Sequence, residues 1–377
     1  MPRHWAMSLS GLVSCQAEVV TRTIDYTALT GPAVPAEVTA FRASVRGRPE
    51  YSNASTVVAI IALVLILGVV GLMFLGFLGI VVALVASDPG NLGAALGGLV
   101  VPVILLAGFV TVAVLAVRGV ARGGKWLRWY RLNRFATQNG FVFSPVDADP
   151  QYPGSIFQLG RARAAVDHLR STSDRFLDYG NYRYTTGSGK NQSTRTWGFL
   201  ALELDRSLPH MVLDSAANNG LFGSNLPATF TKDQVLHLEG DFDKYFTLYC
   251  PKQYERDALY VFTPDLMALL IDNASPFDVE IMDKWMFVYS SRALDLTQPA
   301  VHARLLGIVD TVGAKTLTQT ERYTDERVGD ATVNLVAPQG QRLRRGVSVG
   351  AIIAISVFAV LWLWPFFAGV IGTLVGR

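Results

Sequence analysis

Two long apolar blocks constrain this chain more than any other feature of its sequence. Residues 57–86 and 92–117 contain no Asp, Glu, Lys, Arg or His, and only the pentapeptide SDPGN separates them. Each block exceeds the roughly 20 residues that an α-helix needs to cross a hydrocarbon core. A third block without charged residues follows at residues 346–376. We therefore predict three transmembrane helices: a hairpin at residues 55–117 and one span at residues 342–377.

The remaining residues differ in charge from the flanks of these blocks. Half of the 377 residues are hydrophobic and the net charge is +3, but residues 147–330 hold 18 Lys and Arg against 25 Asp and Glu, a balance of 18 − 25 = −7. An acidic domain at residues 141–341 is a poor match to nucleic acid, whose phosphates require a basic face. We expect no nucleic-acid partner.

The positive charge lies beside the apolar blocks. Three arginines precede the first block and three precede the third, while Asp88 is the only charge between the first two. Basic flanks face the cytoplasm by the positive-inside rule. The sequence predicts a multi-pass plasma (inner) membrane protein with a cytoplasmic N-terminus and soluble domain, and with its C-terminus outside. The arginines before the first block are Arg42, Arg46 and Arg48, and those before the third block are Arg342, Arg344 and Arg345.

Residues 118–140 combine cations with aromatic rings and contain no acidic residue. We interpret them as a juxtamembrane helix whose cations meet anionic headgroups of the bilayer. The alternative is an amphipathic helix that packs its aromatic face on the soluble domain, and both could hold on different faces. The residues predicted to contact the membrane surface are Arg118, Arg122, Lys125, Trp126, Arg128, Trp129, Arg131 and Arg134, together with Arg342, Arg344 and Arg345.

The apolar blocks themselves indicate anchoring rather than transport. Ionisable groups inside a membrane are costly and usually mark a substrate or ion pathway, and these blocks have none. Small residues four apart let helix backbones approach closely, either within this chain, between copies of it or against another membrane protein. The predicted packing pairs are Gly93 with Gly97, Gly346 with Gly350, and Gly372 with Gly376.

The soluble domain alternates strand and helix signals without regular βαβ units, which is typical of an α+β fold with a mainly antiparallel sheet. We predict strands at residues 141–143, 176–184, 196–204, 210–213 and 242–250, and a hairpin of residues 277–282 and 285–290. One helix is expected after Thr263, which can cap it, with Pro264 in the first turn. Another is expected at residues 299–312. Residues 1–54 lack sustained periodicity and predict a mostly flexible tail.

No complete catalytic or metal-binding pattern is present. His168, His210, His237 and His302 lie far apart without metal-ligand spacing, and the glycine-rich residues 187–190 lack the phosphate-loop pattern. Glu239, Asp241 and Asp243 are too few for a calcium loop. The sequence therefore predicts no cofactor and no metal, and whether the protein is an enzyme stays open, with a non-enzymatic role favoured.

Four segments resemble an actinobacterial membrane-protein family that is known only as a domain of unknown function. They are GSIF at residues 154–157, NYRYTTG at 181–187, LEGDFDKYF at 238–246 and YVFTPD at 260–265. The resemblance implies a membrane-anchored cytoplasmic α+β domain and no catalytic residues. We expect an adaptor or subunit of an envelope-associated complex. The alternative is a membrane-tethered enzyme or small-ligand sensor with a cleft near Tyr182, Lys190 and residues 239–243.

Overall fold

The protein is an α+β fold with a mainly antiparallel sheet, as the sequence predicts. The computed structural model describes residues 23–52, 54–87, 90, 93, 100, 102–111, 113–114, 124–172, 175–220, 224–226, 228–330, 332–345 and 358–359. Seven strands are ordered β1-β2-β3-β4-β6-β5, and β7 also pairs with β4. Their bounds are β1 Phe141–Ala148, β2 Arg161–Ser171, β3 Leu177–Thr186, β4 Ser193–Ser215, β5 Val235–Leu236, β6 Phe246–Tyr249 and β7 Asp278–Ser290.

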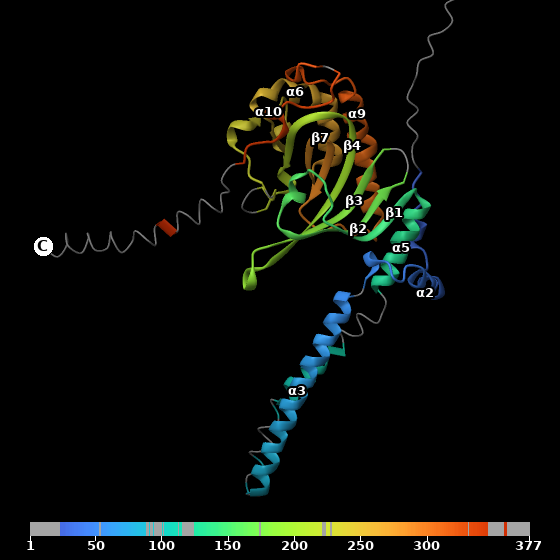
Figure 1. Ribbon diagram of the computed structural model, residues 1–377, viewed down its shortest axis with the longest axis vertical. Helices are drawn as coiled ribbons and strands as arrows, with labels where there is room; N and C mark the ends of the chain where they lie inside the picture. The colour runs from blue at the N-terminus through green and yellow to red at the C-terminus, as the bar shows by residue number, and fades with distance from the viewer. Residues whose placement is uncertain are drawn as a thin grey trace, which may run out of the picture.

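β4 is the strand around which the sheet is built (Figure 1). Its first half pairs with β3, its last four residues pair with β6, and β7 follows it along both halves. The strands predicted at residues 196–204 and 210–213 are therefore two parts of one 23-residue strand. The register shifts twice between Glu203 and Met211, where eight steps along β4 match four along β7, so four extra β4 residues bulge out.

The hairpin predicted about residues 283 and 284 is wrong, because β7 is one continuous strand. Asp283 has a φ of 52°, a conformation that Asp tolerates better than most residues. It kinks β7 opposite the β4 bulge, where Leu208 pairs with Asp283. In a regular strand, odd-numbered and even-numbered residues face opposite sides. The kink shared by β4 and β7 changes this alternation, so that Ile281 and Met286 both point into the same core.

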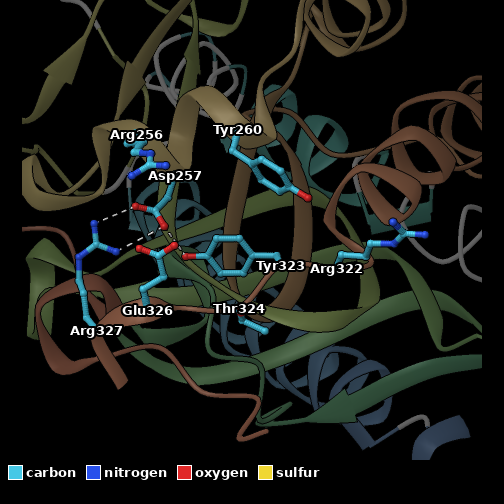
Figure 2. Close-up of a pocket in the computed structure, with 8 residues that line it drawn as sticks. All are labelled: Arg256, Asp257, Tyr260, Arg322, Tyr323, Thr324, Glu326 and Arg327. Carbon is cyan, nitrogen blue, oxygen red and sulfur yellow. Dashed lines mark hydrogen bonds and ion pairs between the residues drawn. The ribbon is translucent and has the colours of Figure 1, made fainter. Parts of the chain in front are cut away.

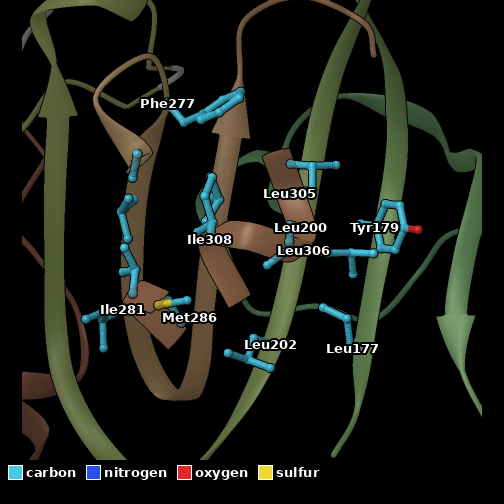
Figure 3. Close-up of a cluster of buried hydrophobic side chains, with 14 of the residues drawn as sticks. Leu177, Tyr179, Leu200, Leu202, Phe277, Ile281, Met286, Leu305, Leu306 and Ile308 are labelled. Carbon is cyan, nitrogen blue, oxygen red and sulfur yellow. The ribbon is translucent and has the colours of Figure 1, made fainter. Parts of the chain in front are cut away.

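The sheet is covered by a hydrophobic cluster on each face. Alternating side chains divide between them, so Leu200 and Leu202 face one cluster while Phe199 and Ala201 face the other. Figure 3 shows the first cluster, in which Leu305, Leu306 and Ile308 of helix α8 lie against the sheet. The second cluster is strongly aromatic, with Phe157 in edge contact with Phe199 and Tyr182. Burial on both faces explains why β4 has few exposed residues.

The helices of the body lie after β6 in the chain. Before β7 come α6 Glu255–Val261 and α7 Pro264–Leu269, and after it come α8 Pro299–Ile308, α9 Ala314–Thr320 and α10 Pro338–Gln341. Helix starts at Pro264 and Pro299 agree with the predictions, and a π-helical turn, η10 Val309–Gly313, joins α8 to α9. The capping role predicted for Thr263 is wrong: its hydroxyl is buried without a hydrogen-bond partner among the described residues.

One described helix, α3 Ala54–Ser87, is long and apolar enough to cross a membrane, by its length and composition. It extends away from the body (Figure 1), and its 27-residue apolar stretch Ile61–Ser87 is exposed. Of the second block, the structure describes a shorter apolar helix, Pro102–Thr111. The third block lies almost wholly outside the described residues. The described chain thus supports one spanning helix rather than three.

The flexible tail predicted at residues 1–54 is wrong for the part of it that is described. Residues 23–52 form α1 Thr27–Thr30, α2 Pro35–Ser44 and the 3-10 turn η1 Pro49–Tyr51. α1 and α2 pack on α5 Gly124–Gln138, which packs on β1, and η1 contacts β1 directly. Short helices of weak periodicity are stabilised here by tertiary contacts rather than by propensity. Residues 1–22 lie outside the described residues.

Candidate functional site: the membrane-proximal collar

The collar, defined here as residues 25–52 together with α5, joins the apolar helix α3 to the α+β body. Aromatic contacts attach its N-terminal segment: Tyr26 stacks on Phe135 with ring centroids 5.9 Å apart, and Tyr51 meets Trp129 edge-on at 5.5 Å. Asn139 adds a polar clamp, because its side chain accepts from the Asp25 amide at 2.7 Å and donates to the Asp25 carbonyl at 2.9 Å. The collar is therefore an ordered part of the domain.

The other face of α5 packs on the body. Trp129, Leu132, Phe135 and Ala136 are buried, which agrees with the packing alternative for this helix. The Phe135 ring lies 4.3 Å from that of His302 on α8, and the Tyr179 hydroxyl on β3 is 3.0 Å from His302 Nδ1. Burial lowers the pKa of His302, while the hydrogen bond to the Leu296 carbonyl acts in the opposite direction. Collar, helix and sheet thus share one core.

The cations of α5 have partners within the protein. Arg128 lies 2.8 Å from Asp167, Arg131 donates to the Gly31 carbonyl at 3.2 Å, and Arg134 is 3.6 Å from Glu37. Asp167 also accepts from the Trp129 indole N–H at 2.8 Å. Burial raises the pKa of Asp167, whereas the charge of Arg128 and the Trp129 hydrogen bond oppose that rise. Lys125 lies over the Trp129 ring, 4.1 Å from its centroid.

A second group of cations, at the turn between α2 and η1, is arranged differently. Arg42, Arg46 and Arg48 are exposed and line a cavity of about 570 Å³ with Trp126 of α5. The Arg42 guanidinium lies 5.2 Å from the Trp126 ring centroid. Arg46 and Arg48 make no salt bridge or side-chain hydrogen bond to any described residue. The ten residues that line this cavity include no carboxylate.

The other residues predicted to contact the membrane lie in different places. Arg118 and Arg122 fall outside the described residues, as do Gly97, Gly346, Gly350, Gly372 and Gly376, while Gly93 is a helical residue. Arg342 lies 3.3 Å from Asp283, and Arg344 pairs with Asp233. Arg345 forms an isolated bridge with Phe230. The C-proximal arginines thus border the body rather than the collar.

The body holds a buried polar cluster that sequence reasoning missed. Glu280 accepts from His210 Nε2 at 2.7 Å, from the amide and hydroxyl of Ser155, and from the Tyr289 hydroxyl at 2.6 Å. The Leu343 amide donates to His210 Nδ1, so Nε2 carries the proton that points at Glu280. Burial favours a raised pKa of Glu280, but the hydrogen bonds from His210, Ser155 and Tyr289 hold it below the usual range.

This cluster is not arranged for catalysis. A Ser–His–acid triad places the imidazole between hydroxyl and carboxylate, whereas here Glu280 lies between Ser155 and His210. All four groups are buried, and four donors saturate the carboxylate. The available signal was Glu280 on the polar side of the alternating residues 277–282. Tyr289 lies nine residues away, but His210 and Ser155 lie 70 and 125 residues away in the chain, which sequence spacing does not indicate.

A second buried carboxylate, Asp178, is also enclosed by donors. His168 Nδ1 lies 2.8 Å from it, the Tyr152 hydroxyl donates at 2.5 Å and Arg170 at 3.1 Å. Burial alone favours a higher pKa of Asp178, but His168, Tyr152 and Arg170 together lower it. No group of three or more His, Cys, Asp or Glu residues in the described ranges is placed to hold a metal ion. The ion pairs of Asp178 with His168 and Arg170 connect strands within the body.

A smaller cavity of about 250 Å³ lies between α6 and the segment after α9 (Figure 2). Asp257 on its wall accepts from the Tyr323 hydroxyl at 2.8 Å and from Arg327 at 3.0 Å. Arg327 also contacts Asp325 and lies over the Tyr254 ring, 4.0 Å from its centroid. These contacts attach residues 322–328 to α6. The polar atoms of Asp257, Tyr323 and Arg327 are therefore already paired within the protein.

The cleft suggested for an enzyme or sensor is not assembled from its predicted residues. Tyr182 is fully buried and its hydroxyl donates to the Phe157 carbonyl, while Lys190 is exposed in the β3–β4 loop. Asp243 lies 2.7 Å from the exposed His237. Buried Tyr182 has no free hydroxyl to offer a ligand.

Comparisons with known proteins do not place the chain in a family. No model of a known protein family matches it, and no curated protein sequence matches it. A crystal structure of the mycobacterial trehalose monomycolate transport factor A, TtfA, is similar over 52% of this chain and 96% of that chain, with 12% identity and a TM-score of 0.35. Similarity at this level does not establish a shared fold or function. The resemblance to an actinobacterial family of unknown function stays a prediction.

Proposed function

We propose that this protein is a membrane-anchored adaptor or subunit of an envelope-associated complex, whose α+β body is held at a membrane face by α3 and the collar. The observation that carries the proposal is the junction between them. An exposed apolar helix begins at Ala54, six residues after Arg48, the last of the three exposed arginines at the α2–η1 turn. Such a junction matches the boundary between hydrocarbon and charged headgroups.

The interior of the body supports an adaptor over an enzyme. Two of its buried carboxylates, Asp178 and Glu280, are enclosed by donors from the protein itself, so neither is poised to move a proton to a ligand. Proteins that act by binding need a stable body and an accessible surface. The two ion-pair clusters supply rigidity by connecting β7, β4, β3 and β2 to neighbouring segments.

The predicted topology belongs to the same proposal. It consists of three spans in the plasma membrane, with the N-terminus and body in the cytoplasm and the C-terminus outside. Arg42, Arg46 and Arg48 beside α3 support the cytoplasmic assignment of the collar. Topology reporters fused after Ser52 and after Arg377 test it. We expect cytoplasmic activity at Ser52 and external activity at Arg377, and cytoplasmic activity at both would contradict three spans.

Partner identification tests the adaptor role. The full-length protein, cross-linked in its native membrane and then purified in mild detergent, should retain a defined membrane partner or a second copy of itself. A matched sample with surface substitutions on the body, such as Arg292→Glu beside β7, shows whether the body contributes to that contact. Repeated recovery of a monomer without any stoichiometric partner would contradict the proposal.

A further inference from the structure

We propose that the cavity at the α2–η1 turn binds the phosphate of an anionic membrane lipid. The site consists of Arg42, Arg46 and Arg48, with Trp126 as its aromatic wall. This inference rests on the proposed membrane anchoring and deepens it, because it names the ligand and the side chains that contact it. It also moves the predicted lipid contact from α5 to the segment that precedes α3.

The first step is the difference in pairing between the two basic segments. Arg128, Arg131 and Arg134 already contact Asp167, the Gly31 carbonyl and Glu37. The side chains of Arg46 and Arg48 make no ion pair or hydrogen bond with the described residues, and Arg42 contacts only the Trp126 ring. Exposed guanidinium groups without a carboxylate partner are available to phosphate, which they can bind in a bidentate manner.

The second step is the shape of the turn. Gly47 has a φ of +89°, a left-handed conformation that most residues avoid, and an added Cβ there would meet no atom within 4 Å. Arg46 and Arg48 flank Gly47, and all three residues line the cavity. The volume of about 570 Å³ lies within the roughly 300–1,000 Å³ of small-molecule pockets.

The third step is the electrostatic balance. Arg42 and Arg46 lie near the C-terminal end of α2, where the helix dipole contributes about half a negative charge. The negative end of that dipole favours cations at the end of α2. Half a negative charge cannot neutralise the three guanidinium groups of Arg42, Arg46 and Arg48. Arg48 lies beyond Gly47 and outside the helix. The cavity therefore keeps a net positive charge that an anion can balance.

The fourth step is the position of the cavity. Ser52 on its rim is separated by one residue from Ala54, where the apolar helix begins. A half-buried Trp126 provides the amphipathic ring that is typical of the level of lipid headgroups. A phosphate attached to a diacyl lipid would reach the arginines while its chains lie beside α3. This placement favours a lipid phosphate over a free one.

The test uses the full-length protein in lipid nanodiscs that contain equal amounts of phosphatidylglycerol and phosphatidylcholine. Native mass spectrometry measures the ratio of the two lipids that stay bound. We expect wild type to retain phosphatidylglycerol preferentially, and R42Q/R46Q/R48Q to reduce that preference at least about ten-fold, since each arginine near an anionic leaflet is worth roughly five-fold. The control R183Q/R195Q/R292Q makes the same charge change at exposed arginines of the body and should retain the wild-type ratio.

Three outcomes would overturn the inference: an unchanged ratio in R42Q/R46Q/R48Q, an equal loss in the control, or complete displacement of the lipid by excess glycerol 3-phosphate, which would identify a free phosphate as the ligand. Alkaline washing of membranes separates this test from that of the proposed function. R42Q/R46Q/R48Q should stay in the membrane pellet with an unchanged unfolding temperature. Release of the wild type itself would contradict the anchoring instead.

Discussion

Two groups of arginines in the collar have similar sequence surroundings but different environments in the structure. Those of α5 contact Asp167, Glu37 and a backbone carbonyl, whereas those of the α2–η1 turn face a cavity without carboxylates. Both groups lie close to an apolar block and to tryptophan residues. The difference shows that a basic flank can stabilise the fold or remain available to a membrane, and that only the partners of each side chain distinguish the two roles.

The largest effect should come from Trp129, which connects the two groups. Trp129→Ala removes a buried ring that contacts Tyr51 and leaves the Asp167 carboxylate without its indole donor. We expect a loss of about 3–5 kcal/mol in the free energy of unfolding. Trp126→Ala, at a half-buried ring, should cost about half as much or less, because less apolar area is exposed to water. Denaturant unfolding of the full-length protein in detergent measures both, and equal losses would contradict the assigned difference.

The next effect compares one arginine from each group. Arg128→Gln leaves the largely buried Asp167 without its ion-pair partner and should lower the free energy of unfolding by about 2–3 kcal/mol. Arg46→Gln removes an exposed side chain without such a partner and should change it by less than about 0.5 kcal/mol. Urea unfolding of the two variants in the same detergent gives the comparison. A larger loss for Arg46→Gln would reverse the roles assigned here.

The pH dependence of Arg128→Gln sharpens that comparison. Burial raises the pKa of Asp167 in the folded protein, so its contribution to stability is complete below the ordinary value of 3.8 and is lost as the pH rises through the folded pKa. Removing the charge of Arg128 raises that pKa further. The stability deficit of Arg128→Gln should therefore be small at pH 3 and grow toward pH 7, with a slope of at most about 1.4 kcal/mol per pH unit.

Arg46→Gln is the matched control for this titration, because no described carboxylate contacts Arg46. Its difference from wild type should stay constant over the same pH range. Thermal unfolding at closely spaced pH values measures both curves. Parallel curves for Arg128→Gln and Arg46→Gln would show that Asp167 does not depend on Arg128.

The smallest effect concerns the turn itself. Gly47→Ala forces a side chain into a positive φ and should cost about 1 kcal/mol. Because the added methyl group meets no neighbouring atom, the cost arises from the backbone alone. Gly124→Ala at the start of α5 is the control, since Gly124 has no such φ and should be neutral or slightly stabilising. Thermal unfolding distinguishes the two, and equal midpoints would contradict the strain at Gly47.

Much of the body could be predicted from local patterns. Alternation identified the strands that pair as β3 and β4. The start of α7 at Pro264 followed from helix N-terminal preferences, and α8 followed from the apolar periodicity of residues 299–312. The Asp283-Lys284 dipeptide was mistaken for a turn because a kinked strand and a hairpin share the same local residues. Only the pairing of Leu208 with Asp283, far apart in the chain, distinguishes them.

The collar could be predicted only in part. The composition of residues 118–140 predicted a helix with cations and aromatic rings, and the packing alternative placed its aromatic face on the soluble domain. The docking of residues 25–52 depends on contacts such as Asn139 with Asp25, 114 positions apart, which no local pattern encodes. For the same reason the sequence could not show that Arg128 is paired with Asp167 while Arg46 has no such partner.

Photocross-linking from two positions in the collar tests the central claim most directly. A benzophenone side chain replaces Ala43, which is exposed at the cavity, or Asn133, which is half-buried midway along α5, in full-length protein in native membranes. The account predicts lipid adducts from position 43 and only protein adducts from position 133. Lipid adducts from position 133 that equal or exceed those from position 43 would contradict it.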